Sequence, residues 1–159
     1  MSDKPILEKT FNENLDIDGR LKEGAVLGRL FLEVQGNDRE ASETALKNMI
    51  FNRMGSEPNM DLLEVKMYEL QEDKAKKFYS GVVEVRLLAR DFRWFLNIVM
   101  RYGPSAIELI EPEGVTLNMD EMQSILADAS EISQSLSTRI LSMLKEDERA
   151  KAYKRLLDG

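Results

Sequence analysis

Four acidic residues that lie close together in the sequence have side chains that could do chemistry: Glu108, Glu111, Glu113 and Asp120. Carboxylate oxygens are the ligands that Ca²⁺ and Mg²⁺ prefer, and Pro112 stands between two of these residues, where a loop could let them converge. The spacing is not that of a calcium-binding loop, which also requires a glycine at a set position. We therefore expect a solvated acidic loop without a metal, and keep the four carboxylates as candidates for a hard-cation site.

Two residue types that carry much of enzyme chemistry are missing from the chain. The sequence contains no His and no Cys. The commonest general base, the commonest zinc ligand and the Ser-His-Asp triad are therefore excluded. Disulfides, thiolate metal sites and thiol catalysis are excluded as well. Catalysis would have to rest on Asp, Glu, Lys, Tyr or Arg, and we expect no cofactor.

Negative charge is concentrated in one part of the chain. The net charge is −7, and range 102–138 holds seven acidic residues but no Lys or Arg. The remainder of the chain balances 22 acidic residues against 22 basic ones. Because proteins bind nucleic acid by neutralising phosphates with Lys and Arg, we do not expect nucleic acid as a partner. The acidic stretch is typical of a solvated face, with a cation site or a basic partner surface as alternatives.

Length and hydropathy indicate a compact intracellular protein. A chain of 159 residues is long enough to bury a real core. No apolar run approaches the ~20 residues of a membrane span. Residues 1–5 lack the basic and then apolar order of a secretory signal. We therefore expect a cytoplasmic protein that does not bind a membrane.

The N-terminal region suggests an edge strand. Phe11, Leu15 and Ile17 all fall on odd positions, which is typical of a strand with one buried face. The pair Asp18–Gly19 then predicts a turn. We expect this leading strand to join the edge of the main sheet.

The middle of the chain alternates strands and helices. Period-two patterns predict strands and three- or four-residue spacings predict helices, in the order strand 25–35, helix 38–54, strand 60–70, charged connector 71–77, strand 79–89, helix 91–102 and strand 106–111. This order is that of the ferredoxin-like βαββαβ fold, an antiparallel sheet with two helices on one face. We therefore predict an α+β domain over residues 1–117.

The same patterns predict the core. Side chains on the inward rows of the strands and helices should be buried together: Leu30, Leu32, Leu46, Ile50, Val83, Val85, Leu87, Phe95 and Leu96. Gly28 interrupts the inward row of its strand. A glycine there indicates a bulge or a close approach of another group to the backbone.

Residues 118–159 are expected to form a helical extension. Asn118 and Glu121 have the spacing of a capping box at its start. Apolar residues then recur every three or four positions and form a narrow stripe: Met122, Ile125, Ala129, Ile132, Leu136, Ile140 and Met143. A helix of this length would extend beyond a small sheet. We expect these residues to form a homodimer interface, or the helix to bend near residues 133–137 and pack on its own domain.

Residues 93–113 resemble part of a known family. A helix rich in Trp and Leu runs into a glycine and then a short strand that ends in proline, with matching positions at Trp94, Leu96, Gly103, Ile107, Glu108, Leu109, Glu111 and Pro112. This segment resembles the C-terminal extension domain of the WYL family of bacterial transcriptional regulators. The resemblance implies a ferredoxin-like unit involved in dimer contacts and in the response to a ligand. The family's helix-turn-helix and Trp-Tyr-Leu core are not found, so DNA binding is not implied.

Three functions are compatible with the sequence. The first is a non-catalytic binding or regulatory module, dimeric, with a small-molecule ligand whose identity the sequence does not give. The second is an enzyme that uses carboxylates with Mg²⁺ or Mn²⁺. The third is a structural or assembly partner. The absence of His and Cys and the apolar C-terminal stripe favour the first.

Overall fold

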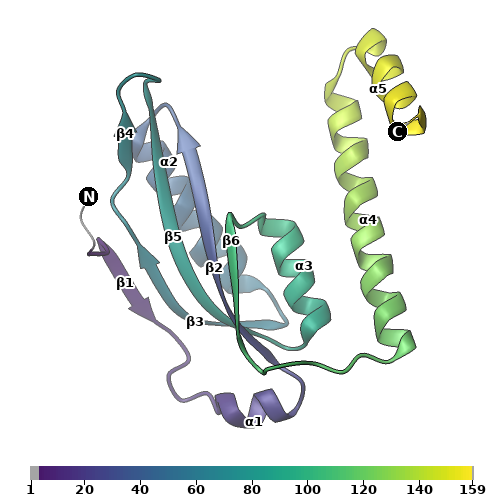
Figure 1. Cartoon of the computed structure of the whole chain (residues 1–159). Coiled ribbons are helices and arrows are strands. Elements are labelled where there is room, and N and C mark those ends of the chain that lie inside the picture. Colours follow the sequence, from purple (N-terminus) through teal and green to yellow (C-terminus); the bar gives the residue numbers. More distant parts are fainter. Residues whose placement is uncertain (1–3, 159) are drawn as a thin grey trace. The chain divides into compact units, whose positions relative to one another are not determined.

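The computed structural model describes residues 4–158, which form two compact units divided between Thr116 and Leu117. The first unit contains the sheet and its helices, and the second is helical (Figure 1). The sequence pattern places the corresponding boundary between residues 117 and 118.

The first unit is an α+β domain, as the sequence predicts. Its elements are β1 (Leu7–Thr10), α1 (Ile17–Lys22), β2 (Val26–Gly36), α2 (Arg39–Lys47), β3 (Met60–Met67), β4 (Gln71–Asp73), β5 (Phe78–Ala89), α3 (Phe92–Tyr102) and β6 (Ala106–Glu111). The strand predicted over 106–111 has the bounds of β6.

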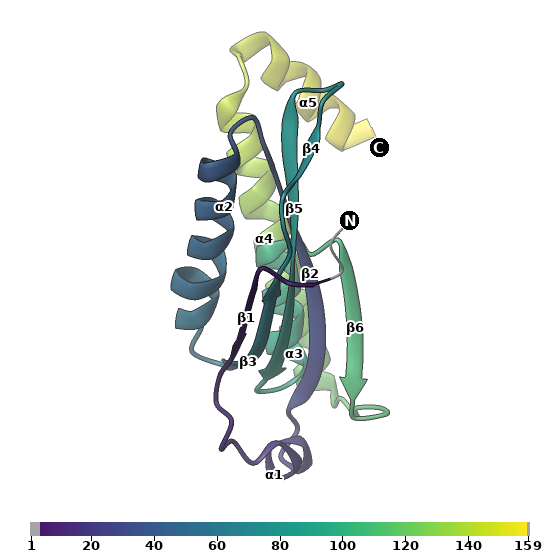
Figure 2. The ribbon, with the colours of Figure 1, turned by 90° about the vertical axis from the view of Figure 1, so that its left-hand side faces the viewer.

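The strands form one antiparallel sheet in the order β1-β3-β5-β2-β6, and the short β4 pairs with β5. The elements β2, α2, β3, β5, α3 and β6 reproduce the ferredoxin-like order, in which β5 lies between the parallel strands β2 and β3. β1 and β6 are the two outer strands (Figure 2). The predicted fold is therefore confirmed, with β1 added to the edge formed by β3.

The main core lies between the sheet and the two helices. Strand residues such as Leu30, Val85 and Val65 pack with Leu46 of α2 and Phe95 of α3, and all are buried. Eight of the nine predicted core residues are buried. The exception is Leu96, which is only half-buried, because the buried face of α3 runs through Phe95 and Ile98.

A second, smaller core lies on the opposite face of the sheet. Leu27 and Leu88 face each other across β2 and β5 and are buried beneath residues of α1, including Ile17 and Leu21. The predicted leading strand is therefore misplaced. Ile17 and Leu21 are four residues apart and share one face of α1, whose first turn is capped by the Asp16 carboxylate, which accepts a hydrogen bond from the Gly19 amide.

The actual edge strand is β1, which pairs with β3 from Leu7 to Thr10. Phe11, which follows it, packs against the main core. Asp18 and Gly19 belong to α1 and form no separate turn. Ile17 and Leu21 both fall on odd positions, and that spacing fits either a strand or a helix. The hydrogen bond from the Gly19 amide to the Asp16 carboxylate favours the helix.

Three other predicted elements differ in detail. The strand predicted over 60–70 ends at Met67. The helix predicted over 38–54 is α-helical only to Lys47, and it continues as a π-helical turn over Asn48–Arg53 and a 3₁₀ turn over Met54–Ser56. The connector predicted over 71–77 begins with a strand, β4, that extends the β5 ladder. The residues of β4 are all polar, so they show no alternation of apolar and polar residues that would predict a strand.

Gly28 has both features that the sequence suggests. A register shift occurs between Leu27 and Gly28 where β2 pairs with β6. A Cβ atom on Gly28 would lie 2.5 Å from the Phe95 ring and 3.0 Å from the Glu108 carbonyl oxygen. The glycine therefore lets α3 pack directly on the β2 backbone.

The second unit consists of α4 (Met119–Met143) and α5 (Glu146–Asp158). α4 is uninterrupted and begins with the predicted capping box between Asn118 and Glu121. α5 turns back beside the end of α4 (Figure 1), where the Arg149 guanidinium donates hydrogen bonds to the Ser142 and Leu144 carbonyls. Within residues 4–158, every helix is too short or too polar to cross a membrane.

Candidate functional site

The structure does not gather the four candidate carboxylates into a metal site. Residues 4–158 contain no group of three or more His, Cys, Asp and Glu side chains placed to hold a metal ion. Glu108 pairs with Arg29 across the sheet, at 2.6 Å. Glu111 and Glu113 are exposed at and beyond the end of β6, and Asp120 lies in the first turn of α4. The negative charge of Asp120 is favourable there, because a helix N-terminus carries a partial positive charge.

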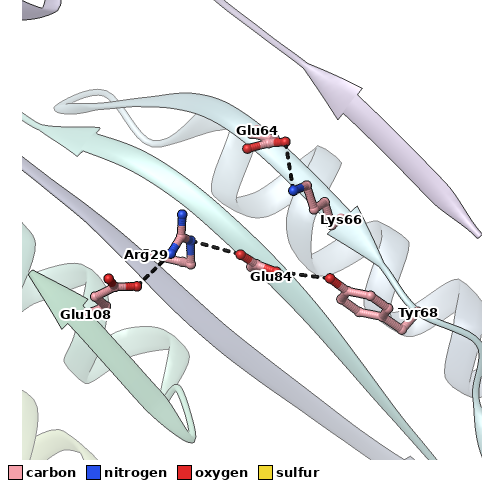
Figure 3. A network of polar contacts seen from close by, with 6 residues as sticks. All are labelled: Arg29, Glu64, Lys66, Tyr68, Glu84 and Glu108. Carbon is pink, nitrogen blue, oxygen red and sulfur yellow. Dashed lines mark hydrogen bonds and ion pairs between the residues drawn. The ribbon is translucent and has the colours of Figure 1, made fainter. Parts of the chain in front are cut away.

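The sheet face opposite α2 and α3 carries a chain of polar contacts (Figure 3). Arg29 of β2 lies between two carboxylates: its Nε is 2.8 Å from Glu84 of β5, and its Nη1 is 2.6 Å from Glu108 of β6. The Tyr68 hydroxyl donates to the second oxygen of Glu84 at 3.1 Å. Lys66 contacts Glu64 at 3.3 Å on β3. Arg29 thus links β2 to β5 and β6, the Tyr68 hydroxyl joins Glu84 from just beyond the end of β3, and the Lys66–Glu64 pair lies within β3.

The pKa values in this network shift away from neutrality. The hydrogen bond to Glu64 raises the pKa of the Lys66 ammonium. Burial, followed by the hydrogen bond to Glu84, raises the pKa of the Tyr68 phenol. Both groups therefore keep their protons at neutral pH, and neither is suited to act as a nucleophile or general base there. The network is suited to hold strands in register and keep this face hydrated.

A second polar cluster joins α3 to the turn after α2. Glu57 is nearly buried, with a side chain 13% exposed, and pairs with Arg101 at 3.0 Å. The Tyr102 hydroxyl donates to the same carboxylate at 2.9 Å. Burial and this hydrogen bond raise the pKa of Tyr102 to about 12. Because Glu57 binds both Arg101 and Tyr102, this cluster fixes the end of α3 to the turn after α2.

Among residues 4–158, most of the large apolar side chains that are exposed to water lie on the helical unit, and α4 carries a row of them. Of the seven residues predicted for its stripe, four are exposed: Met122, Leu136, Ile140 and Met143. The other three, Ile125, Ala129 and Ile132, are half-buried. Leu141 is the buried residue of this helix.

Two exposed apolar residues of α4 were missed by the sequence reasoning. Met119 is 76% exposed and Leu126 is 70% exposed. They fall three residues before and four residues after Met122, so their helical spacing could have placed them in the same row as Met122. The predicted stripe instead runs through Ile125 and Ile132, which occupy a neighbouring row of the same helix.

Comparison with known proteins gives a family. A family model described as the MJ0538 family matches residues 28–155, which is most of the chain. The chain belongs to the MJ0538 family. The match runs from β2 into α5, so the segment shared by the MJ0538 family includes the helical unit.

One MJ0538-family relative is "Uncharacterized protein MJ0538" from Methanocaldococcus jannaschii. It is 32% identical over 95 residues, which is 60% of this chain and 35% of the relative. The matched part of the chain thus spans about a third of that protein's length. No solved structure matches the chain. The comparisons give no support to a resemblance of residues 93–113 with WYL regulators.

Proposed function

We propose that this chain is a non-catalytic binding or regulatory module that forms a homodimer through α4. The observation that carries the proposal is the exposed apolar stripe along α4, which continues to the last turn at Met143. Burying a Leu, Ile or Met side chain stabilises a structure by about 1.5–3 kcal/mol relative to leaving it in water. Several such side chains exposed in one row are unusual on a monomer and mark an interaction surface.

The polar groups of the sheet unit support a non-catalytic role. Arg29 pairs with both Glu84 and Glu108, and the Glu57 carboxylate accepts hydrogen bonds from Arg101 and Tyr102. Catalytic sites usually keep an acid or base poised near neutral pH. In contrast, the pKa shifts of Lys66, Tyr68 and Tyr102 all lead away from neutrality.

Two substitutions test this proposal with the same added charge. Leu136→Asp places a carboxylate in the exposed apolar row of α4. Ser135→Asp places one on the neighbouring exposed position, which points away from that row. Size-exclusion elution with light scattering should show a monomer for Leu136→Asp and a dimer for Ser135→Asp, and circular dichroism should show the same sheet signal for both. Equal masses for the two variants would refute the assignment of the interface to this row.

A further inference from the structure

The exposed row of α4 has a regular two-step spacing. Positions alternate by three and four residues from one end of the helix to the other: Met119, Met122, Leu126, Ala129, Ser133, Leu136, Ile140 and Met143. We name these eight residues the α4 seam. Alternation of three and four gives a mean period of 3.5, which is the period of the contact row in a left-handed coiled coil. Six of the eight are large and exposed, and the other two, Ala129 and Ser133, are small.

The α4 seam has the same arrangement of side-chain sizes in both directions. Large residues lie at each end, and the two small ones lie in the middle. When a second α4 is laid antiparallel with its centre at Glu131, large residues face large ones: Met119 with Met143, Met122 with Ile140, and Leu126 with Leu136. Ala129 then faces Ser133 in the middle, where two helices can approach closely. Every position of the seam has a partner, and the arrangement has the two-fold symmetry of a closed dimer.

Charge favours this direction over a parallel pair. The first half of α4 carries Asp120, Glu121 and Asp128. A parallel pair would place these acids at the same level in both copies. An antiparallel pair places them level with residues 134–142, whose one charged residue is Arg139. It also sets the two helix dipoles in opposite directions, so that the acidic beginning of each α4 lies beside the C-terminal half of the other.

The second helix of this unit leaves the α4 seam open. Leu141, the buried residue of α4, follows Ile140 by one position, which turns it about 100° around the helix. Its position is well away from the centre of the seam. Ile140 and Met143, on either side of it in sequence, remain 59% and 79% exposed. α5 therefore packs beside the α4 seam without covering it.

We infer that the occupant of the α4 seam is the α4 of a second copy, in an antiparallel coiled coil centred at Glu131. This inference rests on the proposed homodimer and adds its direction and register. It predicts which residues meet: the beginning of each α4 contacts the end of the other. It also explains why Ala129 and Ser133 interrupt an otherwise large apolar row.

Spin-label distances test the direction, because the chain has no Cys and one substituted Cys gives one label per copy. Asp120→Cys and Ser142→Cys form a matched pair, since both positions are exposed and lie equally far from Glu131. In the antiparallel pair, two Asp120 labels lie about 33 Å apart along the helix, for 22 residues at ~1.5 Å each. Two Ser142 labels lie equally far apart. A mixture of the two labelled proteins should add a much shorter distance, because those labels lie level with each other.

The outcomes separate this inference from the proposed function. The masses and circular dichroism of the labelled proteins, compared with the unlabelled chain, confirm that the labels leave the dimer intact. A dimer with a short distance between Asp120 labels, and no new short distance in the mixture, would be parallel; it would overturn the antiparallel register and leave the homodimer standing. A monomeric mass with no dipolar signal between copies would overturn both.

Discussion

Gly28 shows how one residue positions a helix on the sheet. It lies where β2 shifts register against β6, and the Phe95 ring occupies the space that a side chain would need. The buried ring of Phe95 and the backbone of β6 thus share one contact point. The spacing of β2 showed that Gly28 was unusual, but only the packing of α3 shows why.

Gly28→Ala should therefore destabilise the fold. The added Cβ would lie 2.5 Å from the Phe95 ring, which must move within a packed core, and overpacking of this kind typically costs about 1–3 kcal/mol. Urea unfolding of the variant measures the loss in free energy. Gly114→Ala is the control, because no atom lies within 4 Å of a Cβ built there. Equal stabilities for the two variants would contradict this placement of α3.

Tyr102 makes stability depend on pH in the alkaline range. Its pKa is raised to about 12 in the folded protein, first by burial and then by the hydrogen bond to Glu57, against about 10 in an unfolded chain. Between those values the folded state binds more protons than the unfolded state, so stability falls as pH rises. The slope from one such group is at most about 1.4 kcal/mol per pH unit.

Tyr102→Phe should remove this contribution. Unfolding free energies measured from pH 9 to pH 12 should fall less steeply for the variant than for the wild type. Tyr153→Phe, at an exposed position of α5, is the control and should keep the wild-type slope. Identical slopes for wild type and Tyr102→Phe would show that folding does not raise the pKa of the Tyr102 phenol.

At the scale of elements, α3 illustrates how a pattern defines a face only approximately. Phe95 is buried and Leu96 is half-buried, although the sequence predicts both in the core. Phe95→Ala should cost roughly 3–5 kcal/mol. Leu96→Ala should reduce the free energy of unfolding by clearly less, because folding buries a smaller part of the Leu96 side chain. Chemical denaturation of both variants measures the two losses of stability. A Leu96→Ala variant as unstable as Phe95→Ala would contradict the orientation of α3 on the sheet.

Much of the sheet could be predicted because alternation and helical spacing are local signals. β2 and β5 each carry apolar residues on a buried row, and their bounds follow within one residue. β6 was predicted from its run of apolar residues, although Ile107 and Leu109 are exposed in the structure. The short elements could not be predicted in this way. β4 has three polar residues, and its existence depends on pairing with β5. α1 has six residues and is stabilised by the cap at Asp16 and by packing on the second core.

The candidate site could be predicted only in part. The capping box and the length of α4 follow from the sequence, and four stripe residues are exposed as an interface requires. Helical spacing alone could not separate two neighbouring apolar rows, one through Met119 and Leu126 and the other through Ile125 and Ile132. Exposure separates them. The pairing of Glu108 with Arg29 depends on which strands are neighbours, and the sequence of β6 alone could not show it.

At the scale of the whole molecule, the two units of the chain differ in how far their apolar side chains are covered. The sheet unit buries most of its apolar residues in two cores, with Ile6, Ile107, Leu109 and Val115 left exposed, and Arg29 pairs with two carboxylates on its sheet. The helical unit leaves a long apolar row in water. The MJ0538 family model extends across both units, so the helical unit is a shared part of the family. A dimer through α4 gives that row a partner.

The mass of the wild-type chain in solution tests this central claim most directly. Sedimentation equilibrium should be measured over a concentration series in the micromolar range. The account predicts a mass near twice the 18.2 kDa of one chain, with dissociation at the lowest concentrations if the two copies exchange. A mass that stays at 18.2 kDa at every concentration would contradict it.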